Sequence, residues 1–419
     1  MSPTLLLALL AFQAQDWTHW RGPDRNGIVA EPSGWGGAGW PLQEPIWSAA
    51  VGDGNTSPLV IPGRLYTMGW SKDQDHVRCL DAATGKDLWK VSYPCPPRGR
   101  HHMGDENYYS GPISTPEVDP ETGRLYTLSI DGDLNCWDTR AEGRKVWGLN
   151  LYARYGVEMR PWTGAERRDY GYITSPLLYR DSVLVQVGAA EGSVMAFAKD
   201  TGKPLWASEC KDPAGHTGGL APMTVEGVPC VAMLTLRNLV VLRLDPGKEG
   251  RTVATHPWTT DFGNNIATPA VYEDSVLITS EYNHKTICRL KITLKGAVPV
   301  WEKPFASKAC SPVIYNGSVY FAWKRLRCLD FASGEQKWEG GNFGDAGSCI
   351  VTGDGKLVAW GGAGRVSLLD PSASEYKELA ATARIFSAPV WPHVVLSAGR
   401  LYCKDRDGNL KAFQVGPSK

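Results

Sequence analysis

One short motif recurs eight times along this chain. A Ser, Thr or Ala followed by Pro opens an apolar stretch at seven points, and a degenerate copy, Ser348-Cys349, fills the one long gap between them. The seven prolines of these anchors are Pro58, Pro116, Pro176, Pro222, Pro269, Pro312 and Pro389. Their mean spacing is about 47 residues, the length of a four-stranded propeller blade. Eight such units predict an all-β fold, an eight-bladed β-propeller with four-stranded antiparallel blades.

A second motif follows the anchors: Asp, then a turn with Gly, then Trp four residues after the Gly. Complete copies occupy 81–89 and 330–338. Asp accepts hydrogen bonds from the backbone two residues on and Gly supplies positive φ, so the motif predicts a hairpin turn. We expect the Trp rings to lie between neighbouring blades, with each indole N–H near a backbone carbonyl. The docking residues predicted in this way are Trp47, Trp89, Trp147, Trp206 and Trp338.

The two ends of the repeat region are complementary. The last unit stops after 413–415 without a Trp of its own, and the segment 44–48 precedes the first anchor. Pairing these segments would complete the eighth blade and leave no open edge in the ring. Residues 44–419 are therefore predicted to form one propeller, and residues 16–43 a strap ahead of it.

The first 15 residues contain a short apolar run from Leu5 to Phe12. The run is too short to span a bilayer and is interpreted as part of a signal peptide, with a disordered or interfacial N-terminus as the alternative. No comparable run recurs, so no transmembrane span is expected, while peripheral membrane association stays open. We therefore expect an exported protein of the periplasm or cell envelope. With 44 basic and 44 acidic side chains, nucleic acid is not an expected partner.

The ten cysteines follow the repeat rather than a disulfide pattern, since no CxxC motif and no adjacent pair occurs. Cys79, Cys136 and Cys328 occupy one equivalent position, with Cys288 as a fourth member, and we expect buried thiols there. The state of the others stays open: Cys95, Cys210, Cys230, Cys310, Cys349 and Cys403.

The turns over 81–89 and 330–338 resemble the tryptophan-docking motifs of the quinoprotein-type, or PQQ-like, propeller family, and the similarity covers about residues 44 to 415. The segment Trp20-Arg21-Gly22-Pro23 resembles the strap found ahead of many such propellers. A ring of this size without large insertions resembles the BamB branch of the family, whose members are scaffolds of the outer-membrane β-barrel assembly machinery. This resemblance implies binding of a protein or peptide partner.

Quinoprotein alcohol dehydrogenases of the same family imply a different site. They carry a disulfide between adjacent cysteines over the quinone and hold Ca²⁺ with Glu, Asn and Asp near a catalytic Asp. No two cysteines are adjacent in this chain. Neither PQQ nor calcium is therefore expected, no catalytic residue is assigned, and an enzyme is the less favoured interpretation.

Two long connections, 95–111 and 152–172, enter innermost strands and are expected at one face, at the mouth of the channel. His216, Asn264 and Asn265 occupy the same entry position in later units. They could face the same mouth, but as lone polar residues they are interpreted first as satisfied loop groups. The other candidate binding residues are His101, His102, Asp105, Glu106, Asn107, Tyr108, Tyr109, Arg160, Trp162, Arg167, Arg168 and Tyr170.

Each connection has a structural interpretation beside the functional one. The histidines and carboxylates of 101–107 are competent metal ligands, but adjacent histidines in a strand point to opposite sides, so packing or a solvated loop is favoured. The Arg, Trp and Tyr residues of 154–172 suit an anionic or aromatic ligand, or equally an inter-blade plug with paired charges.

The sequence as a whole favours a non-catalytic scaffold that docks a peptide or an exposed strand of a protein partner on this face. The alternative is a quinone- or metal-dependent oxidoreductase that uses the channel mouth. No G-x-S-x-G, HExxH or phosphate-loop motif is present, so the sequence gives no support to hydrolase or nucleotide-binding functions.

Overall fold

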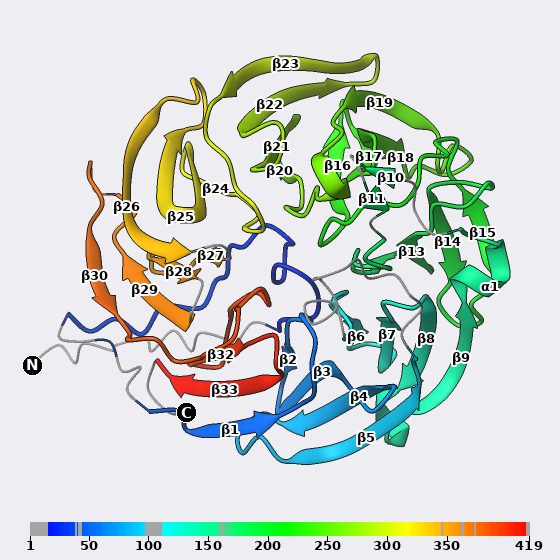
Figure 1. Ribbon diagram of the computed structural model, residues 1–419, viewed down its shortest axis with the longest axis horizontal. Helices are drawn as coiled ribbons and strands as arrows, with labels where there is room; N and C mark the ends of the chain where they lie inside the picture. The colour runs from blue at the N-terminus through cyan, green and yellow to red at the C-terminus, as the bar shows by residue number, and fades with distance from the viewer. Residues whose placement is uncertain are drawn as a thin grey trace, which may run out of the picture.

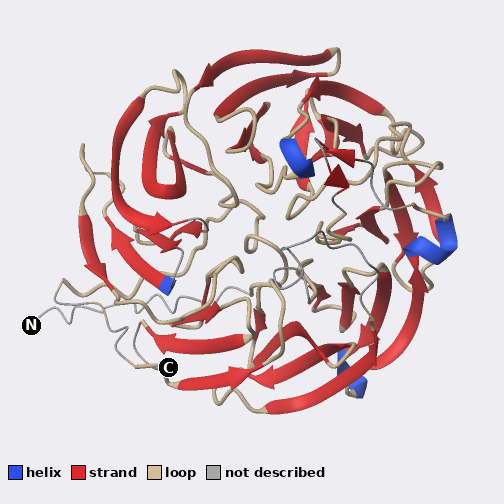
Figure 2. Cartoon of the chain, viewed as in Figure 1, coloured by secondary structure: helices blue, strands red, loops and turns tan. Residues whose placement is uncertain are grey.

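Eight β-sheets surround a central axis in the computed structural model of this chain (Figures 1 and 2). This confirms the predicted eight-bladed, all-β propeller. No described helix is long and apolar enough to cross a membrane. The structure describes residues 16–37, 40, 44–96, 111–158, 162–163, 166–167, 169–344, 347–361, 364–372 and 374–415.

Within each blade the strands pair antiparallel and, in the first seven blades, follow chain order from the axis outward. Blade 1 contains β2 (Leu59–Ile61), β3 (Arg64–Ser71), β4 (Gln74–Asp81) and β5 (Asp87–Pro94). Blade 2 contains β6 (Glu117–Asp119), β7 (Arg124–Leu128), β8 (Asp133–Asp138) and β9 (Arg144–Asn150). Blade 3 contains β12 (Leu177–Tyr179), β13 (Ser182–Gln186), β14 (Val194–Ala198) and β15 (Pro204–Ala207).

The later blades repeat this plan. Blade 4 contains β16 (Ala221–Val225), β17 (Val228–Leu234), β18 (Asn238–Arg243) and β19 (Thr252–Pro257). Blade 5 contains β20 (Ala270–Tyr272), β21 (Ser275–Ser280), β22 (Thr286–Thr293) and β23 (Gly296–Lys303). Blade 6 contains β24 (Val313–Tyr315), β25 (Ser318–Asp330) and β26 (Gln336–Gly344), and blade 7 contains β27 (Gly347–Val351), β28 (Leu357–Gly361), β29 (Arg365–Leu369) and β30 (Glu378–Ala381).

Blade 6 reaches the same size with three strands because β25 fills two positions. Lys324 lies within β25 with a φ of +55°, where the backbone reverses. The Tyr320 side chain in the first half of β25 lies against Cys328 in the second half. Figure 1 accordingly draws β25 as a strand folded back on itself.

Blade 8 joins the two ends of the repeat region. It contains β31 (Val395–Ser397), β32 (Arg400–Lys404), β33 (Asn409–Gln414) and, as its outermost strand, β1 (Trp47–Ala50). Trp47 pairs with Ala412, and Ala50 pairs with Asn409. This confirms the predicted closure of the ring, which leaves no open edge between the first and last blades.

The docking tryptophans lie against the turn of the next blade. The indole Nε1 of Trp47 donates to the carbonyl of Ala82 at 3.1 Å, and that of Trp147 donates to the carbonyl of Lys199 at 2.7 Å. Gly85 in the first of these turns has a φ of +70°, and a Cβ built on it would lie 2.4 Å from the Trp47 ring. The turn glycine therefore supplies both a left-handed backbone and the space that the indole fills.

The other three predicted tryptophans occupy equivalent positions with different polar contacts. Trp89 lies over Gly143 and Trp206 over Gly250, while Trp338 packs edge-on against Tyr376. Within the described part of the chain, Nε1 of Trp89 and of Trp338 has no hydrogen-bond acceptor. Contact of the ring with the next blade is thus common to the set, whereas the indole hydrogen bond and full burial are not, since Trp147 and Trp206 are only partly buried.

Hydroxyl groups of the anchors join neighbouring blades near the axis. In each case a backbone N–H at one anchor donates to the Ser or Thr side chain of the following anchor, which accounts for the Ser or Thr before the Pro. Bonds of this kind run from Ser57 to Thr115 at 3.0 Å, Thr115 to Ser175 at 3.0 Å, Thr268 to Ser311 at 2.9 Å and His393 to Ser57 at 2.7 Å.

The eighth anchor lies later in the chain than the sequence predicted. The motif Ala388-Pro389 does not open a strand, because β31 begins only at Val395. His393 and Val394 take the anchor position instead, with their N–H groups bonded to Ser57 and Ser348.

Candidate functional site

The N-terminal strap runs along the inner strands through the middle of the ring (Figure 1). Trp17 and Val60 of β2 exchange backbone hydrogen bonds of 2.7 and 2.9 Å. Val118 of β6 donates to Thr18, and Val29 donates to Val351 of β27. The strap thereby satisfies backbone groups on the inner edges of three blades, which an empty channel would leave to water.

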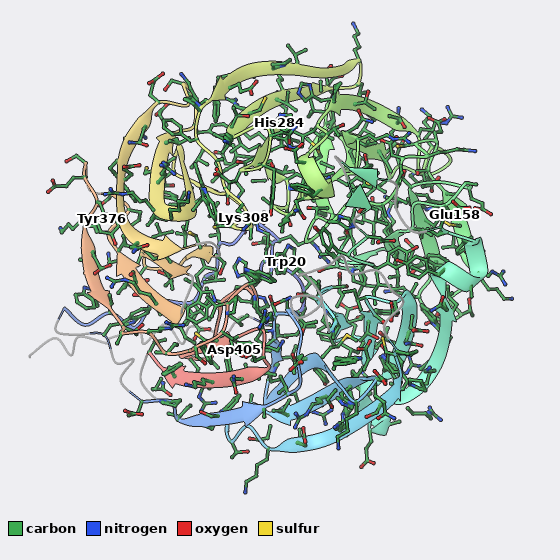
Figure 3. All side chains as sticks on the ribbon, viewed as in Figure 1. Trp20, Glu158, His284, Lys308, Tyr376 and Asp405 are labelled. Atoms are coloured by element: carbon green, nitrogen blue, oxygen red, sulfur yellow. The ribbon has the colours of Figure 1, made fainter. Side chains whose placement is uncertain are left out.

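Trp20 and Arg21 reach across the axis to the opposite side of the ring. Nε1 of Trp20 donates to Oγ1 of Thr268 at 2.9 Å, and its ring meets His393 edge-on at 5.5 Å between centroids. The guanidinium of Arg21 donates to the carbonyl of Pro312. Figure 3 shows Trp20 near the centre of the ring. The channel is therefore occupied, at the level of the anchors, by the chain itself.

The face entered by the connections between blades, called the entry face below, carries a buried polar cluster around His216. Its backbone N–H donates to Oδ1 of Asn265 at 3.0 Å, and its Nδ1 lies 2.9 Å from the carbonyl of Gly263. The ring of Tyr170 meets the imidazole edge-on at 5.0 Å, and Oδ1 of Asp169 lies 4.0 Å from Nε2. All of these side chains are buried.

This cluster brings together predicted residues from three blades. Tyr170 precedes blade 3, His216 precedes blade 4, and Asn264 and Asn265 precede blade 5. They interlock the entry connections of those blades and leave no described side chain of the set exposed to a partner. The short helix η3 (Asp261–Gly263) supplies the carbonyl that meets His216.

Most of the other predicted residues lie outside the described residues: His101, His102, Asp105, Glu106, Asn107, Tyr108, Tyr109, Arg160 and Arg168. Trp162 and Arg167 pair through their backbones in a small hairpin, β10 (Trp162–Thr163) and β11 (Glu166–Arg167). β10 lies near η3, so this described part of the connection from blade 2 to blade 3 is close to the entry of blade 5.

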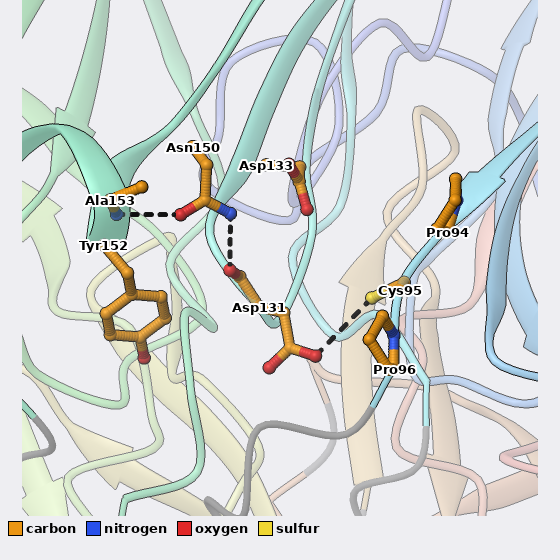
Figure 4. Close-up of a pocket in the computed structure, with 8 residues that line it drawn as sticks. All are labelled: Pro94, Cys95, Pro96, Asp131, Asp133, Asn150, Tyr152 and Ala153. Carbon is orange, nitrogen blue, oxygen red and sulfur yellow. Dashed lines mark hydrogen bonds between the residues drawn. The ribbon is translucent and has the colours of Figure 1, made fainter.

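The described ends of both long connections meet at one pocket of about 580 Å³ between blades 1 and 2 (Figure 4). Cys95 and Pro96 follow β5, whereas Tyr152 and Ala153 belong to helix α1 (Leu151–Tyr155) after β9. The remaining lining residues are Pro94, Asp131, Asp133 and Asn150.

Local hydrogen bonds hold the polar groups of this pocket in place. Asn150 caps α1 by accepting from the N–H of Ala153 at 3.0 Å, and its Nδ2 donates to the carbonyl of Asp131 at 3.0 Å. The Cys95 thiol lies 3.2 Å from Oγ of Ser129 and donates to Oδ2 of Asp131 at 3.7 Å. The pocket wall is thus fixed by contacts between two blades rather than by one loop.

Carboxylates give the pocket its electrostatic character. Burial raises the pKa of Asp133, while a hydrogen bond with Asn150 and the charge of Lys145 oppose that rise. Behind the wall, burial raises the pKa of Asp75 to about 7, although Ser129, Cys95 and Tyr93 provide hydrogen bonds. Burial and the nearby Asp75 charge also raise the pKa of the Cys95 thiol, so this sulfur is a neutral thiol at neutral pH.

The sequence analysis missed Asp131 and Asp133. Both belong to the Asp131-Gly132-Asp133 turn between β7 and β8, and Gly132 has a φ of +91°. The pattern was readable as a turn, and turns between second and third strands share the face of the entry connections. Its position beside Cys95 and Pro96 depends on the packing of two blades, which no local pattern shows.

The described residues do not match the site that the resemblance implies for a quinone and Ca²⁺. Trp20 and Arg21 occupy the axis at the level of the anchors, and no two cysteines are adjacent in the chain. Across the described ranges, no group of three His, Cys, Asp or Glu side chains is placed to hold a metal ion.

Comparison with known proteins identifies similarity both to quinone alcohol dehydrogenases and to BamB. The quinone alcohol dehydrogenase, dehydrogenase subunit, of Gluconobacter oxydans (strain 621H) is 30% identical over 155 residues, which are 36% of this chain and 18% of that protein. The corresponding subunit of Acetobacter aceti is 30% identical over 157 residues, 36% of this chain and 19% of that protein. The chain thus matches about a fifth of the length of these relatives.

Two solved structures share the fold. BamB from Moraxella catarrhalis has a TM-score of 0.60 at 12% identity, covering 88% of this chain and 99% of that one. Quinohemoprotein alcohol dehydrogenase from Comamonas testosteroni has a TM-score of 0.65 at 14% identity, covering 96% and 81%. The family model described as outer membrane protein assembly factor BamB matches residues 73–340. Because that match spans more than half of the chain, the protein belongs to this BamB-type family of PQQ-like propellers.

Proposed function

We propose that this protein is a non-catalytic scaffold of the cell envelope that binds a protein partner through its entry face. The observation that supports this most is the filled channel. Since Trp20 and Arg21 reach across the axis, the rigid ring offers its connections rather than its lumen to other molecules. The family description, an outer membrane protein assembly factor, favours the same role. The assignment of residues 1–15 to a signal peptide remains a prediction.

The pocket between blades 1 and 2 is the proposed docking point on that face. Asp131 and Asp133 give it negative charge, and the Tyr152 ring offers an apolar wall. A Lys or Arg side chain from an extended segment of the partner matches this combination, because its apolar stem packs on the ring while its charged end meets the carboxylates. The helix cap at Asn150 keeps these groups fixed before binding, which lowers the entropy lost on association.

Peptide binding to the full chain tests this function. The probes are two fluorescent peptides of equal length, one with three Arg residues and one with three Glu residues in the same positions. We expect the Arg peptide to bind more tightly, and the double variant Asp131→Asn with Asp133→Asn to weaken its binding by about tenfold, equivalent to about 1.4 kcal/mol. Fluorescence anisotropy at two salt concentrations measures both effects.

A matched control removes the same charge elsewhere. Asp200 and Glu375 are exposed in turns after third strands, on the opposite face of the ring, so Asp200→Asn with Glu375→Gln should leave the affinity unchanged. If both double variants weakened binding of the Arg peptide equally, the loss would come from net charge alone and would contradict the proposed docking point. Dye-linked alcohol oxidation after incubation with PQQ and Ca²⁺ would contradict the non-catalytic role and favour the oxidoreductase alternative.

A further inference from the structure

Two cysteines from neighbouring blades meet beside the channel. Cys310 lies just ahead of β24 in blade 6, and Cys349 lies within β27 in blade 7. Their sulfur atoms are 3.9 Å apart, and each residue is 1% exposed. The inner strands β24 and β27 are packed side by side, so the two sulfurs are held on adjacent, rigid elements.

The pair differs from the other buried thiols of the chain. Cys79, Cys136, Cys288 and Cys328 each lie in a separate blade, at the repeat position that the sequence assigned to packing. Among the described residues, no other two cysteine sulfurs are within hydrogen-bond distance of each other. The repeat explains why the first group of thiols is buried. It does not explain why the sulfurs of Cys310 and Cys349 meet between blades 6 and 7.

A buried guanidinium of the strap accompanies the pair. Arg21 is 2% exposed, and its Nη2 donates to the carbonyls of Asn26 and Pro312. Its Nε has no hydrogen-bond partner, and no carboxylate in the described part of the chain forms an ion pair with it. A hydrogen bond from Cys349 and the positive charge of Arg21 both lower the pKa of the Cys310 thiol. A thiolate at this position would therefore meet a compensating charge.

We propose that Cys310 and Cys349 form a disulfide that joins blades 6 and 7 next to the strap. The Cys310 thiolate attacks a small or protein-borne disulfide, forms a mixed disulfide with one of its sulfurs and releases the other as a thiolate. The Cys349 thiolate then attacks the Cys310 sulfur and releases the second. The two cysteines lose two electrons and two protons, and the oxidant is reduced to two thiols.

The strap would cover this bond once the ring has closed. Gly27 of the strap packs closely against Val313 and the backbone of Cys349. A Cβ built on Gly27 would lie 2.8 Å from the Val313 side chain and 3.2 Å from the carbonyl of Cys349. Exchange with external thiols needs access to a sulfur atom. The folded protein should therefore retain the disulfide in mild reductant and lose it only when it is unfolded.

Thiol counting on the full chain tests the proposal. The protein is unfolded with reductant, refolded in a buffer of reduced and oxidised glutathione, unfolded again and labelled with N-ethylmaleimide. We expect eight of the ten cysteines to be labelled and a linked pair of peptides containing Cys310 and Cys349. The intact mass should be about 2 Da lower than that of the reduced chain. Protein purified without reductant provides a second sample that needs no refolding.

Two variants make the count specific. Cys310→Ser should label all nine of its cysteines, whereas Cys403→Ser, at another fully buried thiol, should label seven and keep the linked peptides. Labelling of all ten cysteines in the wild type from both sources would overturn the proposal, as would a linked peptide from any other pair. Neither result depends on whether the entry face binds a partner.

Discussion

Replacing Gly85 by Ala would place a methyl group against the indole ring of Trp47. A Cβ built on Gly85 lies 2.4 Å from Cε3 and 2.6 Å from Cδ2 of that ring. The ring cannot easily retreat, because its Nε1 donates to Ala82 and its own strand closes the eighth blade against β33. Either the turn or the closing strand must move.

The expected destabilisation has two contributions. Gly85 has a φ of +70°, and holding a residue with a Cβ in that region costs about 1–2 kcal/mol. Inserting a methyl group into packed surroundings costs about 1–3 kcal/mol more. Gly317 separates the two, since its φ is +68° and no atom lies within 4 Å of its built Cβ. Gly85→Ala should therefore lower the free energy of unfolding by about 2–5 kcal/mol, and Gly317→Ala by about 1–2 kcal/mol.

Urea unfolding followed by tryptophan fluorescence measures both variants. A double-mutant cycle then removes the indole ring. In a Trp47→Ala background, the destabilisation caused by Gly85→Ala should fall to the value found for Gly317→Ala. Equal destabilisation by Gly85→Ala and Gly317→Ala in the wild-type background would refute the argument. The indole would then not rest on the turn, and the docking motif would need another physical explanation.

Two further predictions concern buried polar groups. Because burial raises the pKa of Asp75 to about 7, folding takes up a proton between the ordinary carboxyl pKa and that value, and the free energy of unfolding should fall as pH rises from about 4 to about 7. In Asp75→Asn this fall should be smaller, and identical urea midpoints across that pH range in both proteins would contradict the assignment. Ser57→Ala leaves the buried N–H of His393 without its acceptor and should destabilise the ring by about 1–3 kcal/mol in the same assay, while an unchanged midpoint would show that water replaces the hydroxyl.

The repeat made the ring predictable because its contacts are local or between neighbours. The turn at Asp81 forms from residues within the motif, since Oδ1 of Asp81 accepts from the N–H groups of Ala83 and Thr84. Blade number follows directly from counting such units. The same repeat contains a partner that the sequence analysis missed, the Tyr in the second strand. The centroid of its ring lies 6.0 or 6.1 Å from that of a docking Trp at Tyr66, Tyr126, Tyr320 and Tyr402.

The site was harder to predict because its contacts join segments far apart in the sequence. His216 and Asn265 looked like lone polar residues of separate loops, yet they bond across 49 positions. Arg21 reaches Pro312 across 291 positions, so a strap was predictable from the sequence but its place in the channel was not. Single residues of this kind do not recur from one repeat to the next, so no sequence pattern identifies them as neighbours. Only the three-dimensional ring brings them together.

His393 shows that closing the ring and seating the strap are coupled. Its N–H donates to Ser57 of the first blade, and its ring packs against Trp17 and Trp20 of the strap. Burial, with a smaller contribution from the charge of Arg21, lowers the pKa of His393 to about 4, so the imidazole is neutral at physiological pH. A charged ring here would repel the guanidinium that crosses the axis. The late eighth anchor thus serves the strap as well as the ring: where five of the other blades place Ser-Pro or Thr-Pro, the closing blade places a neutral aromatic side chain against which two indoles pack.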